Sequence, residues 1–176
     1  ALLALQGLLH QRVVEAREGN VGIALLSRLP LTSSAVIVSE PLGFPTIVAM
    51  LEGSGTELRV VASHPMIPLG TNNYEARNAQ LRGLADLIRG MEGPRLLAGD
   101  LNTSMWDRNY RMFENRTRLR NARRGHGILP TWPTFMPIAM IPIDHVLVSA
   151  EIGVESVHSG PAIGSDHLPL VVTVAL

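Results

Sequence analysis

The sequence predicts a mixed α/β (α+β) domain in which a two-layer β-sheet core is flanked by helices. Three observations lead to this fold class. About eight short apolar runs are typical of strands, two or three stretches are helical in pattern, and several strands follow one another as hairpins. The 176 residues, 46% of them apolar, are enough for a hydrophobic core, so residues 1–176 are interpreted as a single domain.

The first third of the chain is predicted to consist mainly of strands. Residues 1–11 carry apolar residues on most helical faces and are interpreted as a short or partial helix. Asn20–Ser27 is a nearly continuous apolar run, as expected of a strand buried on both faces. The turn residues 52–55 predict a hairpin between two of the strands that follow, which we place at 34–39, 46–51 and 58–63.

The rest of the chain is predicted to mix helices and strands. Residues 74–91 form a helix, because the apolar residues Leu81, Leu84 and Ile88 recur at three- and four-residue spacing. Residues 106–124 have a polar helical pattern. The remaining segments are an ordered loop with four prolines over 125–142 and strands at 95–98, 143–149, 154–159 and 168–175.

The charge balance excludes two classes of protein. Fifteen cations, all of them Arg, equal fifteen Asp and Glu, which argues against a globally basic nucleic-acid binder and against an acidic disordered chain. The absence of Cys excludes disulfides, a thiolate zinc site and a thiol nucleophile. Locally, residues 107–124 hold seven Arg against two acidic residues, which suits either contact with a phosphate backbone or anionic lipid, or simply a solvated helix face.

Four polar clusters lie at the ends of apolar strands, where rigid strands commonly support functional sites. Two or three carboxylates with an amide oxygen suit Mg²⁺ or Mn²⁺, and nearby imidazoles suit proton transfer or phosphate binding. The sequence contains no Gly-x-Ser-x-Gly elbow and no Lys for a phosphate-binding loop. The chemistry predicted is therefore metal-assisted attack of water on a phosphate ester, and the clusters are Ser63-His64-Pro65, Gly99-Asp100-Leu101-Asn102, Ile143-Asp144-His145 and Ser165-Asp166-His167.

The last three of these clusters, in this order and at these separations, resemble the endonuclease/exonuclease/phosphatase superfamily of deoxyribonuclease I-like phosphoesterases. The stretches Gly22–Pro30 and Ser63–Pro65 are also similar to segments of that family. The resemblance runs from about residue 20 to the C-terminus. It implies a four-layer αββα sandwich of two packed mixed sheets.

The resemblance also implies roles for individual residues. Asp100 would position or deprotonate the attacking water, and Asn102 would orient both Asp100 and the phosphate. His64 and His167 would contact the phosphate, with His167 available for proton transfer, and Asp144 would orient His167. The implied metal ligands for Mg²⁺ or Mn²⁺ are Asp166, Asp100 and Asn102.

Two further expectations concern neighbouring residues. Because side chains alternate along a strand, His145 points to the face opposite Asp144, and we expect a structural role for it. Arg108, at the start of the cationic segment, is a candidate contact to the substrate phosphate. Four aromatic residues near that segment are candidates for stacking on bases or for anchoring the loop: Trp106, Tyr110, Trp132 and Phe135.

The family's principal Glu ligand, usually preceded by Gln, has no counterpart here, and neither does an Asn nearer the N-terminus. We therefore expect a partial domain that lacks its first strands and that binds metal poorly. Bacterial relatives with similar stretches carry membrane helices ahead of this domain. The location is accordingly left open between the bacterial cytoplasm and anchoring through an upstream segment.

The function predicted from these residues is divalent-metal-dependent hydrolysis of a phosphate ester, a phosphodiester rather than a monoester. Nucleic acid and phospholipid head groups both remain open as substrates, and no obligate protein partner is indicated. The alternative is a non-catalytic domain of the same fold that binds an anionic partner through the Arg-rich segment 108–124.

Overall fold

A computed structural model describes residues 11–19, 21–39, 42–53 and 55–176. Its largest unit is a six-stranded mixed sheet with the strand order β3-β4-β5-β6-β8-β7, in which β5 and β6 are parallel and the other neighbours are antiparallel. The bounds of these strands are β3 Leu31–Ser39, β4 Phe44–Gly53, β5 Thr56–Ser63, β6 Arg95–Asp100, β7 Arg120–Asn121 and β8 Asp144–Val148.

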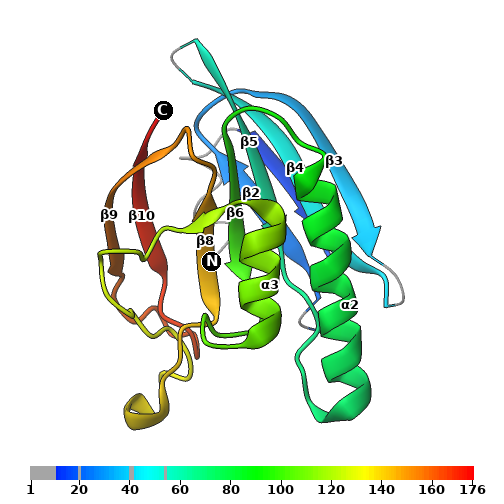
Figure 1. Cartoon of the computed structure of the whole chain (residues 1–176), viewed down its shortest axis with the longest axis vertical. Coiled ribbons are helices and arrows are strands. Elements are labelled where there is room, and N and C mark those ends of the chain that lie inside the picture. The colour runs from blue at the N-terminus through cyan, green and yellow to red at the C-terminus, as the bar shows by residue number, and fades with distance from the viewer. Residues whose placement is uncertain (1–10, 20, 40–41, 54) are drawn as a thin grey trace.

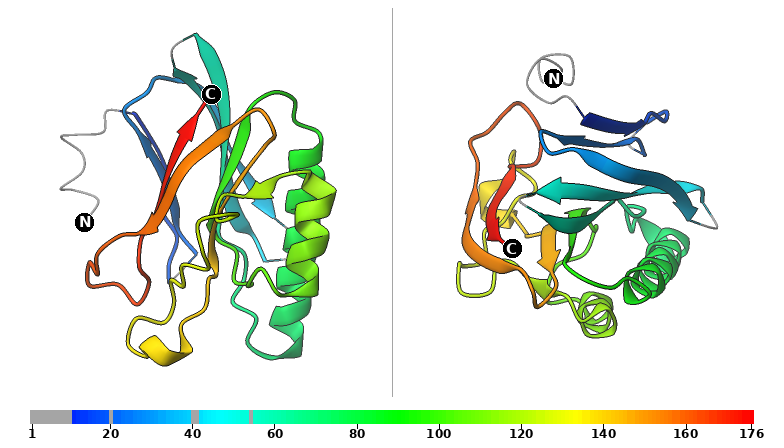
Figure 2. Two further views of the ribbon diagram at one scale, coloured as in Figure 1. Left: turned by 60° about the vertical axis from the view of Figure 1, so that its left-hand side comes forward. Right: turned by 90° about the horizontal axis from the view of Figure 1, so that it is seen from above.

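Helices cover one face of this sheet and two antiparallel strand pairs lie on the other (Figures 1 and 2). The helices are α2 (Gly70–Arg89) and α3 (Arg108–Thr117), and the short 3₁₀ helix η1 spans Pro137–Ala139. The mixed α/β class and the sheet-on-sheet core are therefore confirmed. Within the described residues the second sheet layer consists of two separate pairs, β1 (Gln11–Glu15) with β2 (Ile23–Ser27), and β9 (Gly153–Ser159) with β10 (Leu170–Ala175).

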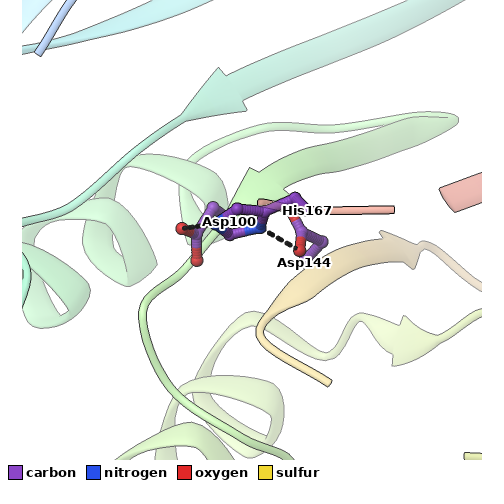
Figure 3. A group of neighbouring side chains, drawn as sticks. All are labelled: Asp100, Asp144 and His167. Carbon is purple, nitrogen blue, oxygen red and sulfur yellow. Dashed lines mark hydrogen bonds and ion pairs between the residues drawn. The ribbon is translucent and has the colours of Figure 1, made fainter. Parts of the chain in front are cut away.

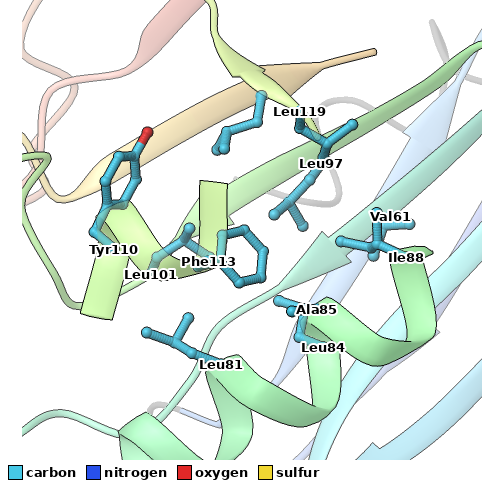
Figure 4. Packing of buried hydrophobic residues seen from close by; sticks show 11 residues of the cluster. Val61, Leu81, Leu84, Ala85, Ile88, Leu97, Leu101, Tyr110, Phe113 and Leu119 are labelled. Atoms are coloured by element: carbon cyan, nitrogen blue, oxygen red, sulfur yellow. The ribbon is translucent and has the colours of Figure 1, made fainter. Parts of the chain in front are cut away.

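The helix-covered face carries the larger hydrophobic cluster (Figure 4). The apolar stripe of α2 packs on β5 and β6, because Leu81, Leu84 and Ile88 all fall on one side of the helix. From β6, Leu97 is fully buried in this cluster, and Phe113 of α3 completes it. The predicted helix over 74–91 is thus confirmed, with its start four residues earlier at Gly70.

The predicted helix over 106–124 is too long. Asp107 caps α3 by accepting a hydrogen bond from the Asn109 amide at 2.6 Å, and the helix ends at Thr117. Arg118 adopts a left-handed conformation (φ 57°), which stops the helix and turns the chain into β7. Cationic residues mask this break in the sequence, because Arg is an equally good helix former on either side of it.

Four other expectations differ in detail or fall outside the described part. Residues 1–10 of the predicted N-terminal helix are not described, and Gln11 begins β1, a strand the sequence pattern did not predict. The strand predicted over Asn20–Ser27 starts at Ile23, and its residues are half-buried rather than buried on both faces, apart from buried Ser27. No helix in the described part of the chain combines the length and the apolar character needed to cross a membrane.

Candidate active site

Strand pairing brings two carboxylates together. Asp100 ends β6 and Asp144 begins β8, and the antiparallel register places these two residues directly opposite each other. Cross-strand partners point to the same face of a sheet, so both carboxylates lie on the side away from the helices. His64 follows β5, the parallel neighbour of β6, and therefore emerges at the same sheet edge.

A glycine makes this edge possible. Gly99 has φ 153°, and a Cβ placed on it would lie 2.0 Å from the backbone oxygen of Ser63. Any side chain at this position would therefore push β6 away from β5 just before Asp100. The Gly-Asp pair of the sequence motif is thus one structural unit: the glycine permits the close approach that sets the position of the acid.

His167 connects the two carboxylates (Figure 3). Its Nδ1 lies 2.8 Å from Asp144 Oδ2, and its Nε2 lies 3.9 Å from Asp100 Oδ2. On the other side of Asp100, His64 Nε2 lies 3.6 Å from the same oxygen. Because the Asp144 carboxylate can only accept, it favours a proton on His167 Nδ1 and leaves Nε2 directed at Asp100.

The Asp100 carboxyl has an unusual acidity. Its pKa is raised to about 6, mainly by burial and further by the charges of Asp144 and Asp166, while the hydrogen bond from the Asn102 amide and the proximity of His167 oppose the rise. A carboxylate that is destabilised by burial and by two like charges is stabilised by a bound cation. The electrostatics therefore fit a divalent metal at this point.

The donor atoms for such a metal are in place. Side-chain donors of Asp100, Asp144 and His167 lie within 4.8 Å of one another, and they are the group of this kind found among the described residues. Asp166, predicted as a metal ligand, lines the same cavity but stands outside that group. Its Oδ2 accepts a hydrogen bond from Trp132 Nε1 at 3.2 Å, which fixes the carboxylate at the cavity wall.

Asn102 is buried and held from several directions. Its backbone N–H donates to Asp100 Oδ1 at 2.8 Å, and its side-chain amide donates to the Pro65 carbonyl at 2.9 Å. Its backbone is in the left-handed region (φ 49°), which asparagine tolerates better than most residues. The predicted role of Asn102 in orienting Asp100 thus has a direct contact behind it.

Arg77 supports this loop, and sequence reasoning missed it. The side chain is buried on α2, and its guanidinium donates to the Asn102 carbonyl at 3.0 Å and lies 3.7 Å from Asp107. Burial lowers the pKa of Arg77 from its ordinary value, opposed by Asp107 and Tyr74. The available signal was its position: Arg77 falls four residues before Leu81, on the apolar stripe of the helix.

These residues line a cavity of about 680 Å³ at the carboxyl end of β6. Its polar wall includes His64, Asp100, Asn102, Asp166 and His167, whose separate motifs the structure brings together. Asp144 stands behind His167 through their hydrogen bond. The remaining lining residues are mostly apolar: Gly22, Ile67, Pro68, Leu69, Trp132, Ile141 and Ile143.

Arg108 is not part of this cavity. It is the exposed first residue of α3, so the structure does not place it near the acids. Most of the cationic segment is also occupied elsewhere. Arg123 is buried, Arg116 pairs with Asp86, Arg124 pairs with Glu114, and Arg120 donates to the Ile152 carbonyl.

The aromatic residues near the segment divide into three groups. Tyr110 is 1% exposed and contacts the buried His145 ring, with centroids 4.6 Å apart, so it cannot stack on a base. Trp132 lines the cavity, while Trp106 and Phe135 are exposed, which rules out core anchoring by Phe135. His145 itself lies on the helix-covered side, and its Nε2 is 2.8 Å from the Thr103 carbonyl, as the alternation of the strand predicts.

Comparison with known proteins agrees with this arrangement. A sequence profile of the Endonuclease/Exonuclease/phosphatase family matches residues 2–167. Comparison with curated protein sequences gives no match.

Solved structures of low sequence identity share the fold. A conserved protein of unknown function from Enterococcus faecalis is 20% identical with a TM-score of 0.77, covering 94% of this chain and 76% of its own. An endonuclease/exonuclease/phosphatase from Beutenbergia cavernae is 23% identical with a TM-score of 0.75; the match covers 88% of this chain but 47% of that one. The 3′ phosphatase NExo from Neisseria, bound to a product DNA hairpin, is 17% identical with a TM-score of 0.82 over 99% of this chain and 82% of its own. This chain belongs to the endonuclease/exonuclease/phosphatase family.

Proposed function

We propose that this chain hydrolyses a phosphodiester with the help of a divalent cation, Mg²⁺ or Mn²⁺. The observation that carries the proposal is the Asp144–His167 pair set beside an Asp100 carboxyl of raised pKa at one cavity wall. Titratable groups whose environments shift them in a shared cavity are typical of catalytic sites. The family membership supports phosphate-ester hydrolysis in general.

The residues of this chain divide the work as follows. Asp100 and Asp166 carboxylates, with the Asn102 amide oxygen, would hold the cation, which supplies charge neutralisation and a more acidic water. Asp144 fixes the orientation of the His167 ring through its 2.8 Å bond. His64 and His167 flank Asp100 and, when protonated, donate to the phosphate oxygens; Asp100 accepts a proton from the attacking water.

The lining of the cavity favours a diester over a monoester. A diester carries one negative charge at neutral pH and a monoester carries nearly two, which calls for cationic donors. Within the described part of the chain, the cavity wall contains imidazoles but no Arg. Its apolar walls on both sides of the acids also suit the two substituents of a diester.

The test compares bis-p-nitrophenyl phosphate with p-nitrophenyl phosphate, in Mg²⁺ and in chelator. We expect turnover of the diester that chelator removes, and a loss of about 10³-fold in kcat/KM for Asp166→Ala, as typical when a metal-site carboxylate is removed. Exposed Glu155 on β9 provides the matched control, Glu155→Ala, with no change. Because the chain has no Gln-Glu pair, low turnover is expected, and Mn²⁺ binding by calorimetry is measured in parallel. Activity that persists in chelator, or a preference for the monoester, would contradict the proposal.

A further inference from the structure

The most exposed large apolar side chains are not scattered over the surface. Four of them are more than two thirds exposed in the described part of the chain: Leu69 at 75%, Phe135 at 70%, Ile138 at 99% and Ile163 at 69%. The next in rank, Met112, is 55% exposed. Isolated surface apolar residues are normal, but a set that gathers in one place marks an interaction surface.

All four belong to loops at the end of the sheet that carries the candidate site. The loop that contains η1 and the turn that leads into α2 both reach the lower end of the molecule in Figure 1, beyond the end of β6. The loop 160–164 lies next to the η1 loop, because the Thr134 amide donates to the Asp166 carbonyl at 2.9 Å and Thr134 Oγ1 donates to that of Ser165 at 3.0 Å. Leu69 and Trp132 line the cavity from two of these loops.

The three loops carry no charge. Residues 65–69, 133–140 and 160–164 contain no Asp, Glu, Arg or His, and each contains at least one proline. Prolines restrict the backbone and hold such loops in defined shapes without burying them. The apolar rim, defined as Leu69, Phe135, Met136, Ile138 and Ile163, therefore presents an uncharged surface around a cavity that holds acids and imidazoles.

We propose that the apolar rim inserts into the head-group region of a phospholipid bilayer, so that the substrate of the site is the phosphodiester of a lipid. This inference rests on the proposed phosphodiester hydrolysis. A lipid head group is the phosphate ester that lies directly beside an apolar phase, which matches a polar cavity within an apolar rim. A nucleic-acid backbone would instead require cations at the rim, and there are none.

The reaction at such a surface needs no additional reactant. The oxygen of water bonds to phosphorus, one P–O ester bond breaks, and one proton of the water ends on the oxygen of the leaving alcohol. The other proton is taken up by Asp100 or by solvent. The rim contributes position: it places the head group at the cavity mouth while the lipid chains stay in the bilayer.

The experiment is flotation of the full 176-residue chain with phosphatidylcholine vesicles in about 0.5 M NaCl, where charge attraction is screened over a few Å. We expect binding by the parent chain and a loss of about a hundredfold in the double variant Ile138→Ser/Ile163→Ser, about tenfold for each exposed isoleucine. The control is Met112→Ser/Val38→Ser, which removes exposed apolar residues of α3 and β3 and leaves binding unchanged.

Turnover separates this inference from the function on which it rests. Neither isoleucine lines the cavity, so Ile138→Ser/Ile163→Ser keeps the parent's turnover of soluble bis-p-nitrophenyl phosphate and loses turnover of the vesicle lipid. Vesicle binding with no turnover of either ester supports the docking surface and overturns the hydrolysis. Equal vesicle binding by the parent and the double variant overturns the inference. Binding restricted to anionic vesicles at low salt, or loss of single-stranded DNA binding in the double variant, also overturns it.

Discussion

The two faces of the six-stranded sheet are built for different purposes. On the helix-covered face, Leu97 and Leu147 are fully buried beneath α2 and α3. On the opposite face, their neighbours Leu96 and Val146 are only half-buried, and the same strands β6 and β8 end in Asp100 and Asp144. One face supplies most of the packing energy, and this allows the other to hold exposed and unfavourably close acids beside a cavity.

Strand alternation produces this difference within two adjacent residues. Asp144 and His145 are neighbours on β8, yet Asp144 bonds His167 at the cavity and His145 packs on Tyr110 under the helices. The environments shift these groups in opposite directions. Burial lowers the pKa of His145 to about 4, whereas burial and like charges raise the pKa of Asp100 to about 6.

The largest expected effect on stability compares adjacent leucines. Leu97→Ala leaves a cavity in the helix-side cluster and should cost about 3 kcal/mol of unfolding free energy. Leu96→Ala, on the half-buried side, should cost about 1 kcal/mol. Urea unfolding at pH 7 measures both. Equal losses for the two variants would show that the faces do not differ in packing as we infer.

The second prediction uses the opposite titrations. Because the folded pKa of His145 lies below its unfolded value of 6.5, the folded state binds fewer protons there, and its stability is lost as pH falls from about 6.5 towards 4. His145→Gln removes this loss, so the variant should gain about 2 kcal/mol relative to the parent between pH 7 and pH 4.5. Urea unfolding at the two pH values, in chelator, measures the change.

Asp100→Asn gives the matched comparison from the other face. The raised folded pKa of Asp100 means that its charge costs stability above about pH 6 and that this cost is relieved as pH falls towards 3.8. The variant should therefore be favoured over the parent at pH 7 and lose that advantage at pH 4.5. A shift of the same sign for His145→Gln and Asp100→Asn would refute the contrast between the faces.

The smallest predicted effect concerns the support of His167. Asp144→Asn keeps the shape but removes the charge that orients the ring, so kcat/KM for the diester should fall about 10- to 100-fold, as for other residues that orient a functional histidine. Unfolding free energy should change by less than about 1 kcal/mol, because both side chains are partly exposed. A variant with full activity and an unaltered pH–rate profile would remove Asp144 from the site.

Much of the fold followed from local patterns. The apolar stripe of α2 and the hairpin at residues 52–55 are short-range features, and the structure contains both. The errors occurred where local preference gives no signal. The end of α3 at Arg118 depends on a left-handed residue and on the pairing of β7 with β8, which is a contact distant in sequence. The same holds for β1, whose partner β2 determines it.

The candidate site divides in the same way. Sequence alone supplied the chemical inventory of acids, amide and imidazoles, because their types and order are visible in the motifs of His64, Asp100, Asn102, Asp144 and Asp166–His167. It also showed that no thiol or lysine chemistry is available. It did not show that Arg108 lies outside the cavity or that Arg77 braces Asn102 from within the core.

Only the tertiary structure determined which acids share a face and how strongly they interact. The register of β6 against β8 pairs Asp100 with Asp144, and Gly99 allows β6 to approach β5 closely at that point. Register, burial and the resulting pKa of Asp100 arise from contacts between strands more than 40 residues apart in the chain. Residue types are a local property, whereas distances and electric fields depend on the packed whole, and the apolar rim was visible only after its three loops met at one end.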